Sequence, residues 1–339
     1  ATITADPDDG YHFVSWTGDG IADLNASTTT VDMTQERNAT ASFSINRHVL
    51  TVNAGTGGSA SGSDTYDWNS SVSIEATPET GHHFVNWTGA VTDFTSTSTT
   101  VTMDQNRTVT ANFAIDEHLL TLSAGTGGSV PDSDTHDYDT NASITATPDT
   151  GYHFVNWTGD GITDLNASTT TVNMTQDRNA TATFAIDRHV LIVSKETGGT
   201  ATGSETFDWN SSAPIVATVN TGYEFTGWTG AGVDHADALS TTVAMTQDRN
   251  VTATFAIKSY TLNTNASTGG SVSASGIHDH GTDANITATP QTGYSFIDWT
   301  GDGIADLNAA TTTVDMTQDR NVTANFEAII HSLVVLAAS

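Results

Sequence analysis

Apolar and polar residues alternate with a period of two along several short stretches of the chain, seen most clearly in residues 46–115. Examples are His48-Val-Leu-Thr-Val52, Val72-Ser-Ile-Glu-Ala76 and Thr99-Thr-Val-Thr-Met103. A period of two places alternate side chains on opposite faces of an extended chain, so each stretch predicts a β-strand. Further strands are expected at 83–87 and 107–113, with a weaker one at 59–68. No stretch has the 3.6-residue period of a helix, and the expected fold class is all-β.

The same alternation predicts which residues form the core. One side of each strand carries large apolar residues, and we expect that side to face inward. The predicted core residues are Val49 or Leu50, with Val52, Val72, Ile74, Phe84, Trp87, Val101, Met103, Val109 and Phe113.

This pattern occurs five times at a pitch of 70 to 71 residues. The Trp of the motif Gly-x-x-Phe-x-x-Trp-Thr-Gly recurs at Trp16, Trp87, Trp157, Trp228 and Trp299. Repetition at this period is typical of a tandem array of small modules. The spacing from Trp to the following Met is 17 residues in four copies and 16 in the second. A deletion is most easily accommodated in a surface loop, which we place at residues 18–29 and their equivalents.

The repeat predicts the domain organisation. We expect an incomplete first repeat at 1–45, which lacks two leading strands, and a separate C-terminal strand at 329–339. Four complete repeats are expected between them, at 46–115, 116–186, 187–257 and 258–328.

The order of motifs resembles the divergent form of the internalin B-repeat. In the third copy it reads Gly151-Tyr-His-Phe-Val-Asn-Trp-Thr-Gly159 and Arg178-Asn-Ala-Thr-Ala-Thr-Phe184. The resemblance covers essentially the whole chain and implies small, β-grasp-like modules strung in tandem on microbial surface proteins. It implies no catalytic residues. Two departures, Val219 for Pro and His82 for Tyr, affect turn stiffness and edge packing rather than the assignment.

The composition limits which binding partners and which cellular compartment are compatible with the chain. The chain has 39 Asp and Glu against 9 Lys and Arg, a formal charge of −30, which repels nucleic acid and anionic membranes. There is no Cys, and no apolar run approaches the ~20 residues of a membrane span, so we expect no direct membrane insertion. Richness in Thr, Ser, Asn, Asp and Gly favours an extracellular or cell-surface protein, with a salt-adapted cytosolic protein as the competing interpretation.

The two ends of the sequence lead to a hypothesis of self-association. The first copy lacks its leading strands, whereas the tail carries an apolar strand without the rest of its module. Insertion of this tail into the first repeat of another molecule would form a head-to-tail homopolymer. The expected contact residues are Ile3, Ile329, Ile330, Leu333, Val334, Val335 and Leu336. Alternatively, the sequence is a window cut from a longer array.

Candidate chemistry is sparse. The loop Gly18-Asp-Gly-Ile-Ala-Asp-Leu-Asn25 and its copies resemble parts of calcium loops, although the bidentate Glu is missing. The calcium candidates are Asp19, Asp23, Asp160, Asp164, Asp302 and Asp306; no other cofactor is expected. Four Asn-x-Thr sequons follow the repeated Arg and are glycosylation candidates, namely Asn38, Asn179, Asn250 and Asn321. Trp68 and Trp209 lie outside the five-fold Trp position, and a sugar-binding aromatic platform is an alternative role for them.

These observations favour a non-catalytic structural extracellular protein over an enzyme. The first interpretation is a filament subunit joined by strand insertion. The alternative is a stalk or ligand-binding segment of a cell-surface adhesin, with glycans or cell-surface components as partners. An enzyme is disfavoured because no catalytic constellation can be assembled from the motifs.

Overall fold

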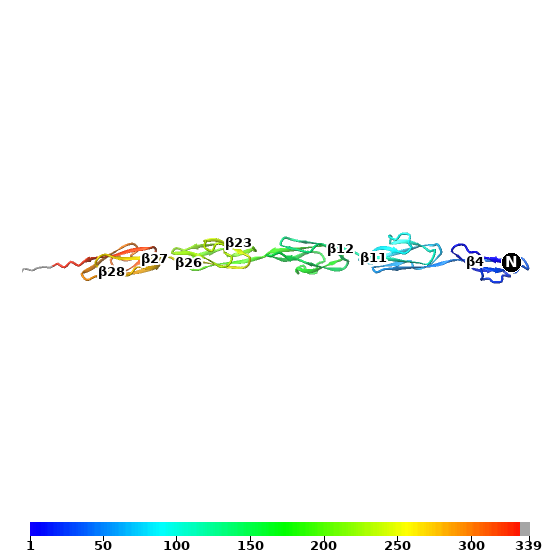
Figure 1. Cartoon of the computed structure of the whole chain (residues 1–339), viewed down its shortest axis with the longest axis horizontal. Coiled ribbons are helices and arrows are strands. Elements are labelled where there is room, and N and C mark those ends of the chain that lie inside the picture. Colours follow the sequence, from blue (N-terminus) through cyan, green and yellow to red (C-terminus); the bar gives the residue numbers. More distant parts are fainter. Residues whose placement is uncertain (333–339) are drawn as a thin grey trace, which may run out of the picture. The chain divides into compact units, whose positions relative to one another are not determined.

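The computed structural model describes residues 1–332, and in that range the protein is built from strands without any helix (Figure 1). The all-β fold class predicted from the alternation is therefore confirmed, as five tandem modules, of which the first is shorter and the other four have about 70 residues. None of the described segments is a helix long and apolar enough to cross a membrane.

The second repeat shows the complete module. Its strands are β5 (Arg47–Ala54), β6 (Gly58–Ser61), β7 (Asp64–Asp67), β8 (Ser71–Pro78), β9 (His82–Thr88), β10 (Ser98–Thr102) and β11 (Arg107–Ile115). These match the predicted strands with one correction: the stretch expected as a single strand at 59–68 is two strands. The break falls at Gly62, whose φ of +119° is readily adopted only by glycine.

The strands of this module form two sheets. One has the order β7-β5-β11-β9, and the other has the order β10-β8-β6. All neighbouring pairs are antiparallel except β5 and β11, which are parallel and pair Arg107 with Leu50. Because the first and last strands are parallel neighbours, the chain enters the module at one end of this sheet and leaves at the other.

The fourth and fifth repeats keep this topology, whereas in the third the three-stranded sheet is interrupted and forms two separate pairs of strands. The third has β12 (Glu117–Ala124), β13 (Gly128–Ser129), β14 (Asp134–Asp137), β15 (Thr140–Thr145), β16 (Thr147–Pro148), β17 (Tyr152–Gly159), β18 (Thr169–Met174) and β19 (Arg178–Ile186). The fourth has β20 (Arg188–Lys195), β21 (Gly199–Thr202), β22 (Glu205–Asp208), β23 (Ser211–Val219), β24 (Tyr223–Thr229), β25 (Ser240–Met245) and β26 (Arg249–Ile257). The fifth has β27 (Ser259–Ala266), β28 (Gly270–Val272), β29 (Gly276–Asp279), β30 (Asp283–Pro290), β31 (Tyr294–Thr300), β32 (Thr311–Asp315) and β33 (Arg320–Ala328).

The first repeat contains β1 (Thr2–Thr4), β2 (Tyr11–Thr17), β3 (Thr28–Thr30) and β4 (Thr40–Ile45). Its two sheets have two strands each, β2-β4 and β1-β3. Strand β4 corresponds to β11, but no described strand pairs with it in parallel.

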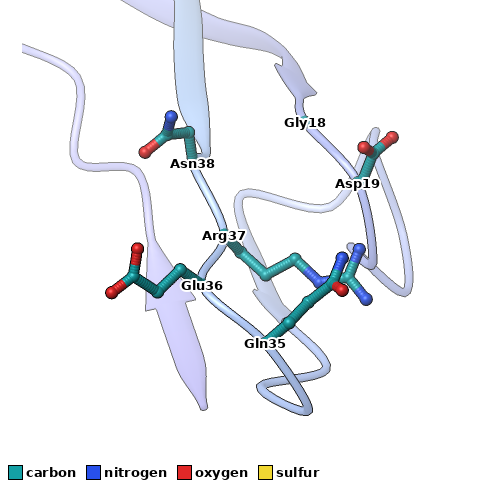
Figure 2. A pocket seen from close by; sticks show the side chains of 6 residues that line it. All are labelled: Gly18, Asp19, Gln35, Glu36, Arg37 and Asn38. Atoms are coloured by element: carbon teal, nitrogen blue, oxygen red, sulfur yellow. The ribbon is translucent and has the colours of Figure 1, made fainter.

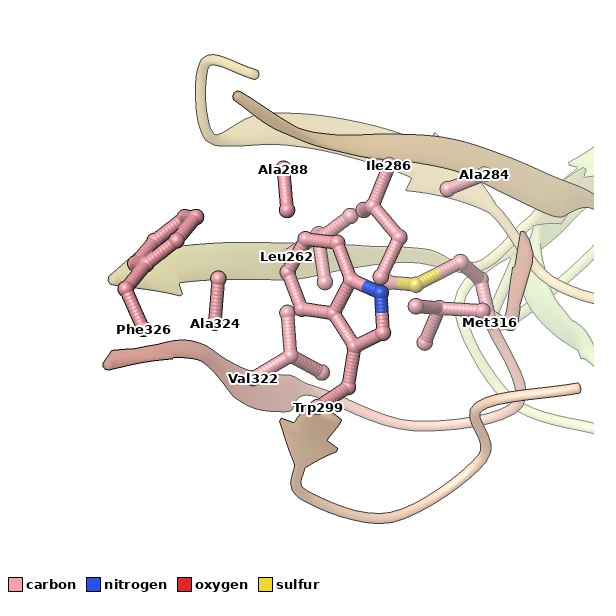
Figure 3. Close-up of a cluster of buried hydrophobic side chains, with 10 residues drawn as sticks. Leu262, Ala284, Ile286, Ala288, Trp299, Met316, Val322, Ala324 and Phe326 are labelled. Atoms are coloured by element: carbon pink, nitrogen blue, oxygen red, sulfur yellow. The ribbon is translucent and has the colours of Figure 1, made fainter. Parts of the chain in front are cut away.

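A tryptophan occupies the centre of each core. In the fifth repeat Trp299 is 1% exposed and lies between Ile286 of one sheet and Val322 of the other (Figure 3). Its indole Nε1–H donates to the carbonyl of Ala309 at 2.9 Å, so the loop after β31 is attached to the core from inside. The predicted core of the second repeat is confirmed. Of the two alternatives in the prediction, Leu50 is the buried residue and Val49 is 49% exposed.

The described residues divide into two compact units, Ala1–Asp149 with Phe154–Ala185, and Thr150–His153 with the described residues from Ile186 onward. The contacts at the first two repeat boundaries lie within the first unit. The boundary contacts made by Thr150–His153 and those at the fourth boundary lie within the second.

Candidate functional sites

An arginine recurs once in each repeat and supports the loop that follows the core Trp; the five are Arg37, Arg107, Arg178, Arg249 and Arg320. In the first repeat Arg37 Nε donates to the carbonyl of Asp32 at 3.2 Å, and a Cβ atom on Gly20 would lie 3.0 Å from the guanidinium carbon. Gly20 has a φ of +75°. The positive φ favours glycine in this turn, and the missing side chain leaves room for the arginine.

The one-residue deletion in the second repeat falls in this loop, at the glycine that the arginine contacts. It has Gly89-Ala-Val91 where the first repeat has Gly18-Asp-Gly-Ile21, so it lacks the glycine on which the arginine lies. Arg107 instead donates from Nε and Nη2 to the Asp104 carboxylate, at 3.0 and 2.6 Å. The indole of Trp87 still donates to the loop carbonyl of Ser96 at 2.9 Å, so the shorter loop keeps its anchor.

A shallow polar hollow lies beside the arginine in the first repeat. Gln35, Glu36, Arg37 and Asn38 line one side, across from Gly18 and Asp19, and the volume is about 380 Å³ (Figure 2). The third repeat has the same hollow at about 170 Å³, lined by Gly159, Asp160, Gln176, Asp177, Arg178 and Asn179. Carboxylate, amide and guanidinium groups line both hollows, which are more polar than apolar and suited to polar ligands.

The predicted calcium residues have structural roles in part. Asp23 Oδ1 accepts the main-chain N–H of Asn25 at 2.8 Å, and Asp164 and Asp306 do the same for the second residue after each. This arrangement is an Asx turn, which needs no ion. The other three candidates lie at the start of their loops, directly after the first glycine; they are Asp19, Asp160 and Asp302. Within residues 1–332 no three His, Asp or Glu side chains are grouped closely enough to hold a metal ion, and calcium binding stays a prediction.

The second repeat forms the same turn with an additional donor. Asp93 Oδ1 accepts both the main-chain N–H and the hydroxyl of Thr95, each at 2.8 Å. Hydrogen bonds to the ionised carboxylate, first from the backbone of Thr95 and then from its side chain, lower the pKa of Asp93 from its ordinary value of 3.8.

The four sequon asparagines that follow the repeated arginine are all exposed, each at or next to the start of the last strand of its repeat. Their side chains are accessible to a glycosyltransferase, and modification stays a prediction. The four residues are Asn38, Asn179, Asn250 and Asn321.

The boundaries between repeats have a common geometry that sequence reasoning missed. At the first boundary Asn46 is the linker residue: its N–H donates to the carbonyl of Gly10 at 2.7 Å, and its carbonyl accepts the N–H of Trp68 at 2.7 Å. The half-buried Trp68 indole then lies on Gly10, where a Cβ atom would overlap Cε3 and Cδ2 of the ring. Gly10 has a φ of +81°. We call this arrangement of glycine, linker residue and ring the ring-on-glycine joint.

Three further boundaries form the same joint. The rings and glycines are Tyr138 on Gly81, Trp209 on Gly151 and His280 on Gly222. The linker residues Asp116, Asp187 and Lys258 make the same two main-chain hydrogen bonds, at 2.7 to 2.8 Å. The signal in the sequence was present, because the four ring residues recur at the repeat pitch. The structure thus assigns the extra residues Trp68 and Trp209 to repeat boundaries.

A histidine reinforces three of these joints from the preceding repeat. His83 Nδ1 lies 2.8 Å from Asp116 Oδ1, and His153 Nδ1 lies 2.8 Å from Asp187 Oδ1. At the first boundary His12 makes the equivalent 2.8 Å contact with the Asn46 amide oxygen.

The candidate contact residues for self-association are partly described. Ile3 lies in β1 opposite Thr29, and Ile329 donates its N–H to the carbonyl of Gly293 at 2.8 Å. Ile330 is 91% exposed. The other four residues, Leu333, Val334, Val335 and Leu336, lie outside the described residues.

Comparisons with known proteins agree with the repeat structure. The family described as "Divergent InlB B-repeat domain" matches residues 1–47, 48–117, 118–188, 189–259 and 260–330. No curated protein matches the chain. Among solved structures, the chain is similar to the Bacillus anthracis TIE protein, with 7% identity, a TM-score of 0.35, and coverage of 96% of this chain and 68% of that one.

Proposed function

Because the chain belongs to the divergent InlB B-repeat family, which matches it in five tandem copies, we propose that it is a non-catalytic structural protein of the cell exterior. Repeats of this family are typical of bacterial surface proteins. The high negative charge and the absence of cysteine fit such a role. In this role the modules act as spacers, and their number sets the distance between whatever the array connects.

The ring-on-glycine joint is the observation that carries this proposal. A flexible tether would leave its linker residues solvated, whereas here the N–H and the carbonyl of Asn46 and its equivalents are both hydrogen-bonded. Neighbouring modules therefore meet through main-chain hydrogen bonds and a seated ring rather than through a free hinge. The use of Trp68 and Trp209 at the boundaries favours a spacer over a sugar-binding platform.

Small-angle X-ray scattering on the purified chain tests the spacer role. We compare the chain with a variant in which Trp68, Tyr138, Trp209 and His280 are all replaced by Ala. A spacer with fixed joints predicts one well-defined maximum dimension that broadens in the variant. Identical scattering from the two proteins would contradict the proposal.

We further propose that copies of the chain associate through the first repeat. In complete repeats the last strand has a parallel neighbour, whereas β4 has none among the described residues. Met33 and Phe43 are 57% and 41% exposed, although Met103, the equivalent of Met33, is completely buried. A strand added beside β4 would cover these side chains and pair the open edge.

Analytical ultracentrifugation tests the association at micromolar concentration. Head-to-tail polymers are expected for the full chain, and monomers for a chain that ends at residue 328. A 339-residue chain that remains monomeric overturns the filament proposal and leaves the spacer role intact. In that case a stalk or ligand-binding segment of an adhesin is the remaining function.

A further inference from the structure

The fourth repeat differs from its neighbours where its first strand ends. Strand β20 ends at Lys195 and is followed by Glu196, whereas the other complete repeats have Ala and then Gly or Ser at these positions. Those residues are Ala54-Gly55, Ala124-Gly125 and Ala266-Ser267. Lys195 is one of only two lysines in a chain with 39 Asp and Glu. The fourth repeat therefore carries two side chains of opposite charge at a position that is small and uncharged in the other complete repeats.

These two side chains border an open hollow of about 650 Å³, which we call the fourth-repeat hollow. Its lining residues are Lys195, Glu196, Thr197, Tyr223, Phe255 and Ile257. Two glycines hold the rings in place. A Cβ atom on Gly198 would lie 2.4 Å from Cδ1 of Tyr223, and one on Gly199 would lie 2.3 Å from Cζ of Phe255. Both rings thus rest on the backbone of the glycine pair, which gives the hollow a fixed aromatic wall.

The two charged side chains at the rim are exposed, and neither forms an ion pair within residues 1–332. The backbone that carries them is fixed, because the Glu196 N–H donates to the carbonyl of Ala253 at 3.0 Å. An ammonium group only donates hydrogen bonds, and a carboxylate only accepts them. The rim therefore presents a donor and an acceptor in adjacent positions, next to an aromatic wall.

A pyranose sugar matches this combination of groups. Each of its hydroxyls both donates and accepts, so neighbouring hydroxyls can accept from Lys195 and donate to Glu196. The C–H face of the ring can lie against Tyr223, which combines an apolar body with a polar tip. The volume is in the range of about 300–1,000 Å³ that is typical of small-molecule sites. The formal charge of −30 disfavours an acidic polysaccharide, so a neutral sugar is the better match.

We propose that the fourth-repeat hollow binds one pyranose unit of a neutral glycan. Lys195 and Glu196 bind its hydroxyls, and Tyr223 packs against its ring. The site is separate from the tryptophans at the repeat boundaries. It adds a binding function to the array and stands whether or not the modules act as spacers.

Saturation-transfer NMR on the 339-residue chain tests the site. The probes are the methyl glycosides of glucose, galactose, mannose and N-acetylglucosamine. We expect at least one of them to bind with a Kd on the order of 1 mM, as for other ligands of this size. Saturation should be strongest at the ring C–H groups, because these lie against Tyr223. The absence of saturation transfer to all four probes overturns the proposal.

Two substitutions introduce residues that other repeats carry, so each is compatible with the fold. They are Lys195→Ala and Glu196→Gly, which match Ala54 and Gly55 of the second repeat. Each should weaken binding about tenfold, because it removes a hydrogen bond to a charged group. The control Arg188→Ala, which removes an exposed positive charge from the same repeat, should leave the Kd unchanged. Unchanged binding in both rim variants would place the sugar elsewhere and overturn the proposal.

A transplant into the third repeat tests whether the charged pair is sufficient. Tyr152, Phe184 and Ile186 already occupy the equivalent wall positions, and Gly125 lacks a positive φ. Ala124→Lys combined with Gly125→Glu should therefore raise the number of sites from one to two per chain. An unchanged number of sites would contradict the assignment of binding to the charged pair and the wall.

Two charged probes distinguish other ligand classes. Methyl glucuronide carries a carboxylate, and free leucine carries both charges with an apolar side chain. Tighter binding of either probe than of every neutral glycoside overturns the assignment to a neutral sugar. Small-angle scattering from Lys195→Ala should match that from the unaltered chain, so failure of the sugar site and failure of the spacer role are measured separately.

Discussion

His83 and Asp116 lie on opposite sides of a repeat boundary and are joined by a 2.8 Å contact between Nδ1 and Oδ1. The two side chains are 58% and 35% exposed, so water screens the interaction. Exposed pairs of this kind contribute about 0–1 kcal/mol. A half-buried ring such as Tyr138, which lies on Gly81 at the same boundary, should contribute more.

We therefore predict different effects for two substitutions at this boundary. His83→Ala should lower the local stability of the joint by less than about 0.5 kcal/mol. Tyr138→Ala should lower it by about 1–2 kcal/mol. Hydrogen exchange at the amide of Asp116 measures both values. A larger effect for His83→Ala would mean that the polar contact, rather than the ring, holds the modules together.

Gly81→Ala should be more destabilising than Gly293→Ala. Both glycines have positive φ, +77° and +90°, and an L residue in that region costs about 1–2 kcal/mol. A methyl group on Gly81 would also overlap the Tyr138 ring, whereas the space above Gly293 holds no described atom within 4 Å. The difference between the two variants in thermal unfolding isolates the contribution of the ring. Equal destabilisation would show that backbone conformation alone is responsible.

His280→Trp should strengthen the fourth joint. The buried Nδ1 of His280 has no hydrogen-bond partner among the described residues, which is unfavourable for a polar atom. Trp occupies the same position in two other joints and carries more apolar surface. Slower exchange at the amide of Lys258 is expected. The control His278→Trp, two residues earlier in β29, should leave that amide unchanged.

The loop of the second repeat should respond to acid through Asp93. The pKa of this carboxyl is lowered in the folded protein, so its ionised form stabilises the turn above pH 3.8. That contribution is lost as the pH falls below 3.8 through the lowered pKa. An NMR titration of the Thr95 amide should therefore show a midpoint below 3.8, and Asp93→Asn should abolish the transition. A midpoint at or above 3.8 would contradict the assignment of the two hydrogen bonds.

Met174 and Met33 occupy equivalent positions in different environments. Met174 is completely buried, whereas Met33 is 57% exposed. Met174→Ala should destabilise the third repeat by about 2–5 kcal/mol, and Met33→Ala should cost less than about 1 kcal/mol. Hydrogen exchange of core amides in each repeat gives both values. This small cost applies while copies are kept separate by dilution; at concentrations where they associate, the added strand covers Met33 and the cost should rise. An equally large cost in dilute monomers would contradict the exposure of the Met33 side chain.

The strands and the core were predictable because local alternation specifies them. In Val72-Ser-Ile-Glu-Ala76 the apolar residues Val72, Ile74 and Ala76 are buried and the polar residues between them are exposed. The division of 59–68 into two strands was missed, because Gly62 lies within a polar stretch with little alternation. The parallel pairing of β5 with β11 joins residues more than fifty positions apart, and no local pattern reports such a contact.

The repeat boundaries show a second limit of prediction from the sequence. Trp68, Tyr138, Trp209 and His280 recur at the repeat pitch, but their chemical variety conceals a common role. That role is to place a flat ring on a glycine of the preceding module. The pairing of Trp68 with Gly10 crosses a repeat boundary, and an alignment of single copies does not span that boundary. The Arg of each repeat was found as a repeated residue, whereas its position over Gly20 became clear only from the loop geometry.

The ring-on-glycine joint consists of parts that every complete repeat carries: a glycine near one end, and a linker residue and a ring near the other. Duplication or loss of one 71-residue segment of the gene would therefore recreate an intact boundary on each side of the change. The number of modules can then vary between related strains without any compensating substitution. Length becomes a heritable trait that recombination can adjust in whole steps.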